Sequence, residues 1–497
     1  MNKIKQLASQ TAVYGLGTIV PRFLNFLLMT PFYTRVFILG EYGIVTELYS
    51  YAAFLFVLLT YGMETTFFRY SELEKNKDKT YSTALTSLFT TSSLFILFVL
   101  LFSKPLSGLI QYQDNTEYII YFALIIGIDA FIAIPFAKLR QQNKALKFTL
   151  IKIINVISNV SFNFFFLWLC PRIIAQNPDS FITTFYNPEI GVGYAFISNL
   201  IATVITLIIL LPDIINIHFL FDFSLLKKML RYAFPLLIVG LAGMVNEVSD
   251  KLLFRFLLTV PTEIIDGQKY VLSQLGIYGA NYKLAVLMTL FIQMFRYAAE
   301  PFFFSHAKDK DSKVLYADVM KYFIIFCLII FLLVMLFINI FKHFIDEDYW
   351  QGLHIVPIIL LANLFLGIFF NLSIWYKLND ITRYGAYIAL TGAGITILLN
   401  IILIPVFGYT GASWTHFFCY LTMVILSFIL GRKFFPIPYD LRRIGIYFFL
   451  ALGIYFINKF VSFPSESIHL VINTIFIIVF SLTVYFIERP LFKKSFK

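Results

Sequence analysis

Apolar stretches long enough to cross a membrane recur along the whole sequence. A helix needs about 20 mostly apolar residues to span the hydrocarbon core of a bilayer. Only 13% of the 497 residues are charged, whereas soluble globular proteins carry about 25%. The sequence therefore predicts an all-α integral membrane protein. We expect fourteen transmembrane helices, at residues 11–36, 43–68, 80–103, 117–137, 150–170, 190–212, 229–260, 272–301, 319–341, 353–376, 384–406, 411–430, 442–460 and 468–487.

Lysine and arginine are distributed unevenly between the two sides of these spans. Of the 39 basic residues, 28 fall in the termini and loops of one side and 6 in the loops of the other. Basic residues favour the cytoplasmic side, so we expect both termini to be cytoplasmic. This bias also accounts for the net charge of +11. It predicts contact with anionic lipids at the cytoplasmic face and no nucleic-acid partner.

Short sequence matches recur at an interval of 233 to 239 residues. Gly43 and Gly276 each begin a Gly-Ile pair, and Asn163 in one predicted span corresponds to Asn400 in another. Six predicted spans separate the members of each pair, which favours two six-helix lobes in parallel orientation, with a substrate site between them. The predicted parts are an N-terminal lobe at residues 1–220, a C-terminal lobe at 221–435, and helices 13 and 14 with a cytoplasmic tail at 436–497.

Ten charged residues lie inside the predicted spans. Facing lipid, each would cost roughly 2.5–3.5 kcal/mol on insertion scales, and ten of them about 25–35 kcal/mol. The net stability of an ordinary fold is only about 5–15 kcal/mol. Most of these charges must therefore face each other or water inside the protein. They are Arg22, Glu47, Glu64, Asp129, Glu247, Asp250, Lys251, Arg255, Lys283 and Arg296.

The cations among them are candidates for binding an anionic substrate. Arg22 and Lys283 lie near the middle of their spans, and neither has an acid four residues away. Cations at that depth with no such acid on their own helix suit a negatively charged ligand. Lys251 and Arg255 are further candidates. An alternative interpretation pairs Glu247 with Lys251, and Asp250 with Arg255 or Lys283, as internal ion pairs that fix helix packing.

The acids are candidates for coupling or gating. Asp129 stands alone in the middle of its span, either as a proton or ion site or as a buried acid that is held neutral. Glu47, Glu247 and Asp250 lie in spans that also carry cations, and we expect them to take part in coupling or gating. Glu64 and Arg296 lie near the cytoplasmic ends of their spans.

The loops and motifs argue against catalysis. The longest outer loop has about twenty residues, so no separate soluble domain fits between the spans. The sequence contains no phosphate-binding loop of the G-x-x-x-x-G-K-[ST] type and no His or Cys pattern with metal-ligand spacing. We therefore expect a protein that is not an enzyme and that needs no cofactor or metal.

Four N-terminal segments resemble the opening of bacterial polysaccharide-biosynthesis flippases, which are also called O-antigen or oligosaccharide flippases. These are residues 11–22 (TAVYGLGTIVPR), 31–37 (PFYTRVF), 41–44 (EYGI) and 61–69 (YGMETTFFR). That family belongs to the exporter superfamily that also contains multidrug and toxin extruders and the lipid II flippase. The resemblance covers the first twelve predicted spans.

The resemblance implies two lobes around a cationic cavity and movement of undecaprenyl-diphosphate-linked oligosaccharide by alternating access. The setting it implies is the bacterial inner membrane, in lipopolysaccharide or other surface polysaccharide synthesis, with other polysaccharide-assembly membrane proteins as partners. A proton or sodium ion would drive the cycle. Basic residues on helices 1 and 8 of the family correspond to Arg22 and Lys283. The lipid II type has a basic residue on helix 2, where this sequence has Glu47 and Glu64.

Two alternatives remain open at this stage. A cation-coupled multidrug extruder has the same architecture, and the net charge of the predicted spans is zero, which excludes neither substrate. A membrane polysaccharide polymerase or ligase belongs to another class and needs a catalytic outer loop, for which these loops are short.

Overall fold

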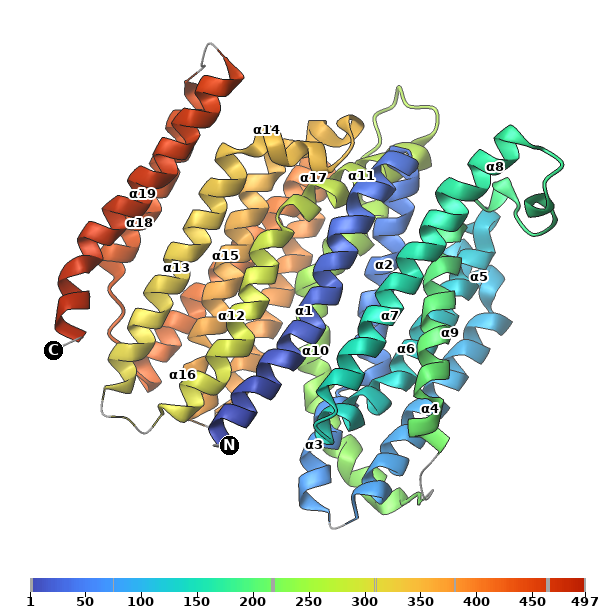
Figure 1. Cartoon of the computed structure of the whole chain (residues 1–497), viewed down its shortest axis with the longest axis horizontal. Coiled ribbons are helices and arrows are strands. Elements are labelled where there is room, and N and C mark those ends of the chain that lie inside the picture. Colours follow the sequence, from blue (N-terminus) through green and yellow to red (C-terminus); the bar gives the residue numbers. More distant parts are fainter. Residues whose placement is uncertain are drawn as a thin grey trace. The chain divides into compact units, whose positions relative to one another are not determined.

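The structure is a computed structural model that describes residues 3–74, 76–215, 220–307, 309, 311–379, 381–461 and 465–495. Over these residues the chain is almost entirely helical and forms no strand (Figure 1). It divides into two compact units. The first contains Met1–Phe256 and Val260–Gly276, and the second contains Leu257–Thr259 and Ile277–Lys497.

Helices, both long and short, make up most of the two units. In the first unit they are α1 (Lys3–Val36), α2 (Leu39–Thr60), α3 (Met63–Leu73), α4 (Lys77–Leu101), α5 (Ser103–Leu109), α6 (Thr116–Gln141), α7 (Ala145–Phe164), α8 (Cys170–Gln176), α9 (Gly193–Ile215) and α10 (Phe223–Leu257). Helix α11 (Gly267–Leu284) begins in the first unit and continues into the second. The second unit adds α12 (Val286–Ser305), α13 (Ser312–Leu336), α14 (Ile338–Phe341), α15 (Val356–Leu372), α16 (Ile374–Leu378), α17 (Arg383–Phe434), α18 (Leu441–Phe460) and α19 (Glu466–Ser495).

The predicted class, an all-helical membrane protein, is confirmed. Among the described residues, eleven helices are long and apolar enough to cross a membrane, or twelve if the bent pair α11 and α12 forms one span. The count of fourteen spans and the lobe boundaries at residues 220 and 435 stay predictions. The border between the two compact units falls later than the predicted lobe boundary, after α10.

Helix α17 is too long to be a single span. Its 52 residues would extend about 78 Å as one straight helix, more than twice the ~30 Å of a bilayer core. The run is broken at Gly408, whose φ of 56° and ψ of −135° are not helical. A Cβ atom on Gly411 would lie 2.3 Å from the carbonyl oxygen of Leu403, eight residues earlier. The chain therefore turns back on itself between residues 403 and 411, at the predicted gap between spans 384–406 and 411–430.

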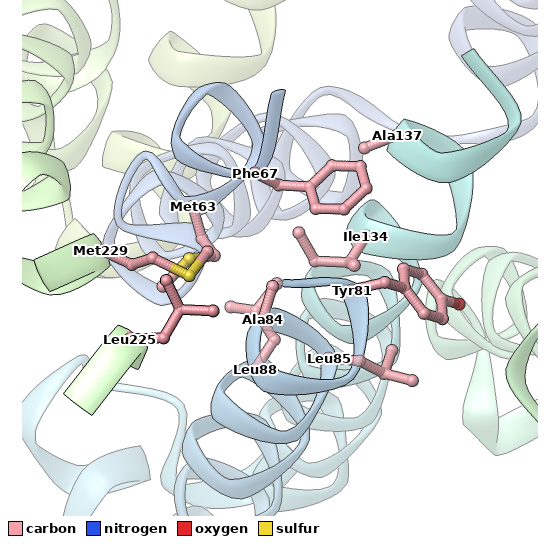
Figure 2. Close-up of a cluster of buried hydrophobic side chains, with 10 residues drawn as sticks. All are labelled: Met63, Phe67, Tyr81, Ala84, Leu85, Leu88, Ile134, Ala137, Leu225 and Met229. Atoms are coloured by element: carbon pink, nitrogen blue, oxygen red, sulfur yellow. The ribbon is translucent and has the colours of Figure 1, made fainter. Parts of the chain in front are cut away.

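The core of the first unit joins the start of α10 to helices from earlier in the chain. Gly62, with a φ of 71°, separates α2 from α3 and directs α3 toward α4 and α6. Figure 2 shows the apolar side chains of α3, α4, α6 and α10 converging there. Burial of this cluster fixes α10, which carries four of the ten charges, in the first unit. The cluster contains Met63, Phe67, Tyr81, Ala84, Leu85, Leu88, Ile134, Ala137, Leu225 and Met229.

A buried ion-pair network attaches the C-terminal helices to α13. Glu488 of α19 is 1% exposed, and its carboxylate accepts hydrogen bonds from Lys321 of α13 at 2.8 Å and Tyr447 of α18 at 2.5 Å. Arg443 lies 3.4 Å from the same carboxylate. Near the other end of α19, the Asn473 amide donates to the Leu336 carbonyl. These two contacts, about 22 Å apart along α19, hold α18 and α19 on α13.

We expect Glu488→Ala to lower the melting temperature of the purified protein clearly. The substitution leaves Lys321 buried without its principal partner, at a cost of about 3 kcal/mol. Asp318→Ala is the matched control, because Asp318 contacts the same lysine but is 45% exposed. An exposed partner contributes about 0.5 kcal/mol. Thermal unfolding in detergent measures both variants. An equal drop in melting temperature for Glu488→Ala and Asp318→Ala would contradict the structural role given to Glu488.

Candidate functional site

The polar stretch of α10 lies at the interior of the first unit. Asn246, Ser249, Asp250, Lys251 and Arg255 are all buried. Glu247, which one interpretation of the sequence pairs with Lys251, is exposed. Three of the four predicted α10 candidates therefore face protein. Charges buried in this way need partners on neighbouring helices or on their own helix.

Arg255 has its partner on α2. Its Nε and Nη2 atoms donate to the Glu47 carboxylate at 2.9 Å and 2.6 Å, and Glu47 is fully buried. The Tyr112 hydroxyl donates to the same carboxylate at 2.6 Å, and its ring lies 4.5 Å from the guanidinium carbon. A bidentate arginine–carboxylate pair with a third donor is among the strongest polar contacts in proteins. We refer to Glu47, Tyr112 and Arg255 as the Glu47 cluster.

The Glu47 cluster extends to the start of α11. The Gln111 carbonyl accepts hydrogen bonds from Arg255 Nη1 at 3.3 Å and from Gln268 Nε2 at 2.7 Å. Gln111 has a φ of 59°, so its backbone is in the left-handed region that few side chains favour. That conformation turns the chain between α5 and α6 toward α10. Parts of α2, the 111–112 turn, α10 and α11 therefore meet at one place.

Glycines allow α2 and α11 to pack backbone against backbone beside this cluster. A Cβ atom on Gly43 would lie 1.9 Å from the carbonyl oxygen of Leu272, and one on Gly276 would lie 1.9 Å from that of Leu39. Only glycine permits so close an approach. Gly43 and Gly276 are the residues that sequence analysis matched as equivalent positions of a repeat, and in the structure they lie against each other's helices.

Removing one member of the Glu47 cluster is expected to destabilise the protein, and removing both charges is not. Glu47→Ala leaves Arg255 buried and unpaired, which costs about 3–5 kcal/mol. The double variant Glu47→Leu with Arg255→Met replaces the pair by apolar groups and is expected to be close to wild type in stability. Thermal unfolding of the two single variants and the double variant checks this. A double variant as unstable as the sum of the single variants would contradict it.

Asp250 and Lys251 form the second buried pair. Lys251 Nζ lies 3.1 Å from an Asp250 carboxylate oxygen and 3.3 Å from the Glu247 carbonyl. The interpretation of Asp250 as a partner of Arg255 is wrong for this structure, because Arg255 binds Glu47 instead. Lys251 is paired with Asp250 rather than with the Glu247 carboxylate that the i, i+4 spacing suggests. The pair lies one helical turn from Arg255 along α10.

Asp129 lies on α6 in a polar region between α7 and α9. Its carboxylate accepts a hydrogen bond from Thr203 of α9 at 3.4 Å, and Lys152 of α7 lies within electrostatic reach of both Asp129 and Arg22. Lys152 Nζ is 4.0 Å from the Phe136 ring. Sequence analysis missed Lys152 because it placed the start of that span at residue 150. Helix α7 begins at Ala145, which puts Lys152 about 10 Å along it.

The two principal cation candidates belong to different units. Arg22 is on α1 in the first unit and Lys283 is on α11 in the second, and both side chains are exposed. Their joint contact with one substrate stays a prediction. Over the residues that the structure describes, no group of His, Cys, Asp or Glu side chains has the arrangement of a metal site.

Comparisons with known proteins give a family for the sequence and similar folds among solved structures. The sequence model of a family described as "polysaccharide biosynthesis protein" matches residues 7–307. None of the curated proteins matches the sequence. Among solved structures, the lipid II flippase MurJ in an inward closed conformation is similar with a TM-score of 0.68 at 14% identity, covering 97% of this chain and all of that one.

Multidrug transporters have a similar fold. An inward-facing multidrug resistance MATE family transporter of the MOP superfamily has a TM-score of 0.60 at 12% identity, covering 88% of this chain and 95% of that one. The MATE multidrug transporter DinF-BH has a TM-score of 0.58 at 17% identity, and the match covers 86% of this chain and 95% of that one. At these identities the likeness concerns the fold.

Proposed function

This chain belongs to the polysaccharide biosynthesis protein family, and from that premise we propose that it is a flippase for lipid-linked oligosaccharide. Its substrate is an undecaprenyl-diphosphate-linked oligosaccharide, which it moves across the bacterial inner membrane for surface polysaccharide synthesis. The fold shared with a lipid II flippase supports a lipid-linked substrate. The observation that carries the mechanism is the buried Glu47 cluster, because alternating access requires contacts that close one side and can be broken.

The proposed cycle begins with the diphosphate entering a cavity between the two predicted lobes from the cytoplasmic side. Arg22 and Lys283 neutralise the diphosphate, and Lys251 contributes when its pairing with Asp250 loosens. The polyprenyl tail stays in the lipid. Lys152, near Arg22, adds positive charge to the part of the proposed cavity that the first unit lines.

In this proposal the Glu47 cluster is the outer gate. It joins α2 of the predicted N-terminal lobe to α10 and α11 of the predicted C-terminal lobe. The Gly43 and Gly276 contacts strengthen the same closure. Arg255 was a substrate-binding candidate, but both sides of its guanidinium are engaged in this cluster. We therefore propose a gating role for Arg255, together with Glu47.

Coupling is proposed for the acids that are not part of the gate. Asp129, beside Lys152 and Thr203, is suited to binding a proton or sodium ion in the first unit. Asp250 and Glu247 lie about one and two turns from Arg255 on α10, so a change of charge there acts on the helix that carries this part of the gate. The cycle needs no bond-making step, and the protein is proposed to be a transporter rather than an enzyme.

A multidrug extruder is the second candidate, because MATE multidrug transporters share the fold. The two functions are separated by deleting the gene and overexpressing the protein. A flippase predicts that complete lipid-linked repeat units accumulate on the cytoplasmic face of the deletion strain and that overexpression gives no drug resistance. Normal surface polysaccharide in the deletion strain, together with drug resistance on overexpression, would overturn the proposal. Export of intact, unpolymerised units would indicate a polymerase instead.

A further inference from the structure

A shallow, open cavity in the second unit lies between α12, α15 and α16, and its empty space is about 360 Å³ when the solvent at its open mouth is counted. Its walls are mainly apolar, with Ile292, Phe295, Phe303 and Ile374 among the lining residues. None of the residues that line it belongs to the proposed gate or to the coupling candidates.

One buried polar atom on the wall of this cavity has no hydrogen-bond partner among the described residues. Asn371 of α15 is 4% exposed, and its Nδ2 atom has no hydrogen-bond partner among the residues that the structure describes. A buried amide donor without an acceptor is unfavourable and rare in folded proteins. An oxygen atom of a ligand in the cavity would satisfy it.

The mouth of the cavity carries one uncompensated positive charge. Lys377 Nζ binds the Glu300 carboxylate at 2.7 Å, so these two charges neutralise each other. Arg296 is exposed, and its guanidinium carbon lies 4.7 Å from the Phe370 ring. In the described part of the chain it takes part in no ion pair. Its Cα lies five residues inside the predicted end of its span, at about 8 Å depth, where a guanidinium reaches lipid phosphates.

We propose that this cavity binds a phosphate-headed lipid. The phosphate oxygens accept hydrogen bonds from Arg296 and from the amide of Asn371, and the first methylene groups pack on Phe295 and Ile374. Bilayer phospholipids and polyprenyl phosphates share this chemistry. The inference concerns binding alone and does not depend on the proposed flipping of oligosaccharide.

The test is native mass spectrometry of the delipidated full chain titrated with phosphatidylglycerol, with a polyprenyl monophosphate, and with diacylglycerol. The variants are Arg296→Gln and Asn371→Leu. Arg383→Gln is the matched control, since Arg383 is an exposed arginine beside an aromatic ring that does not line the cavity. Arg296→Gln alters an exposed side chain, so loss of folding does not confuse its result.

We expect each cavity variant to weaken binding of the phosphate-headed lipids roughly tenfold, the effect of losing one charge-assisted or buried hydrogen bond, and the control to bind as wild type does. Tighter binding of either phosphatidylglycerol or the polyprenyl phosphate than of diacylglycerol supports the site and identifies the lipid. Diacylglycerol binding as tightly as the other two overturns it. Equal weakening by Arg383→Gln overturns it as well, because the effect would then belong to any interfacial arginine.

Discussion

A disulfide between α2 and α11 is expected to stop translocation completely and reversibly. A Cβ atom on Gly40 would lie 3.9 Å from Cβ of Leu272, within the 3.5–4.5 Å range that disulfides need. Gly40 has room for a side chain at ordinary contact distance, so Gly40→Cys is tolerated locally. With Leu272→Cys, oxidation locks the helices that flank the Glu47 cluster. If this is the outer gate, a locked protein cannot release substrate.

The readout is translocation before and after oxidation, and again after reduction with dithiothreitol. Each single cysteine variant serves as a control for the substitutions themselves. The three native cysteines, all among the described residues, are buried and form no disulfide, so they compete little for the oxidant. A protein that has formed the disulfide and still translocates at the wild-type rate would show that α2 and α11 do not separate during the cycle.

Reversing the charge of Arg22 or Lys283 is expected to abolish flipping and leave folded protein in the membrane. Each substitution, Arg22→Glu or Lys283→Glu, replaces attraction for the diphosphate by repulsion. We expect a loss of at least about 100-fold, or ~2.7 kcal/mol. Both side chains are exposed, so neither reversal buries a charge within its unit. Complementation of surface polysaccharide in a deletion strain measures the effect.

Arg172→Glu is the matched control for these two reversals. Arg172 is also exposed, and its guanidinium carbon lies 4.0 Å from the Trp168 ring. It is in the first turn of α8, just beyond the predicted span at residues 150–170, rather than near the middle of a span. It should support normal polysaccharide. Normal polysaccharide with Arg22→Glu and Lys283→Glu as well would contradict the assignment of these cations to the substrate.

The membrane class of the fold follows from the sequence because hydrophobic run length is a local property. The break in α17 could also be placed, since Gly408 and its neighbours interrupt an apolar run that is twice the length of a span. The partner of Arg255 could not be predicted. Glu47 is 208 residues away, and spacing along one helix suggested Asp250 instead.

Lys152 and the contact of Gly43 and Gly276 with each other's helices show two further limits of prediction from sequence. A shift of about five residues in the start of a helix was enough to hide Lys152 as an interior cation. Gly43 and Gly276 were recognised as equivalent residues in a repeat, yet equivalence does not imply contact. Their packing depends on how α2 and α11 cross, which only tertiary structure determines.

The central claim is that this protein moves a lipid-linked oligosaccharide across the membrane. It is tested most directly with the purified protein in lipid vesicles that contain a polyprenyl-diphosphate oligosaccharide labelled on its sugar. A membrane-impermeant reagent added outside then measures how much label has crossed from the inner leaflet. The account predicts crossing with wild-type protein, and none with the oxidised Gly40→Cys, Leu272→Cys variant until it is reduced. Label that crosses no faster than in protein-free vesicles, while a cationic drug is transported by the same preparation, would contradict it.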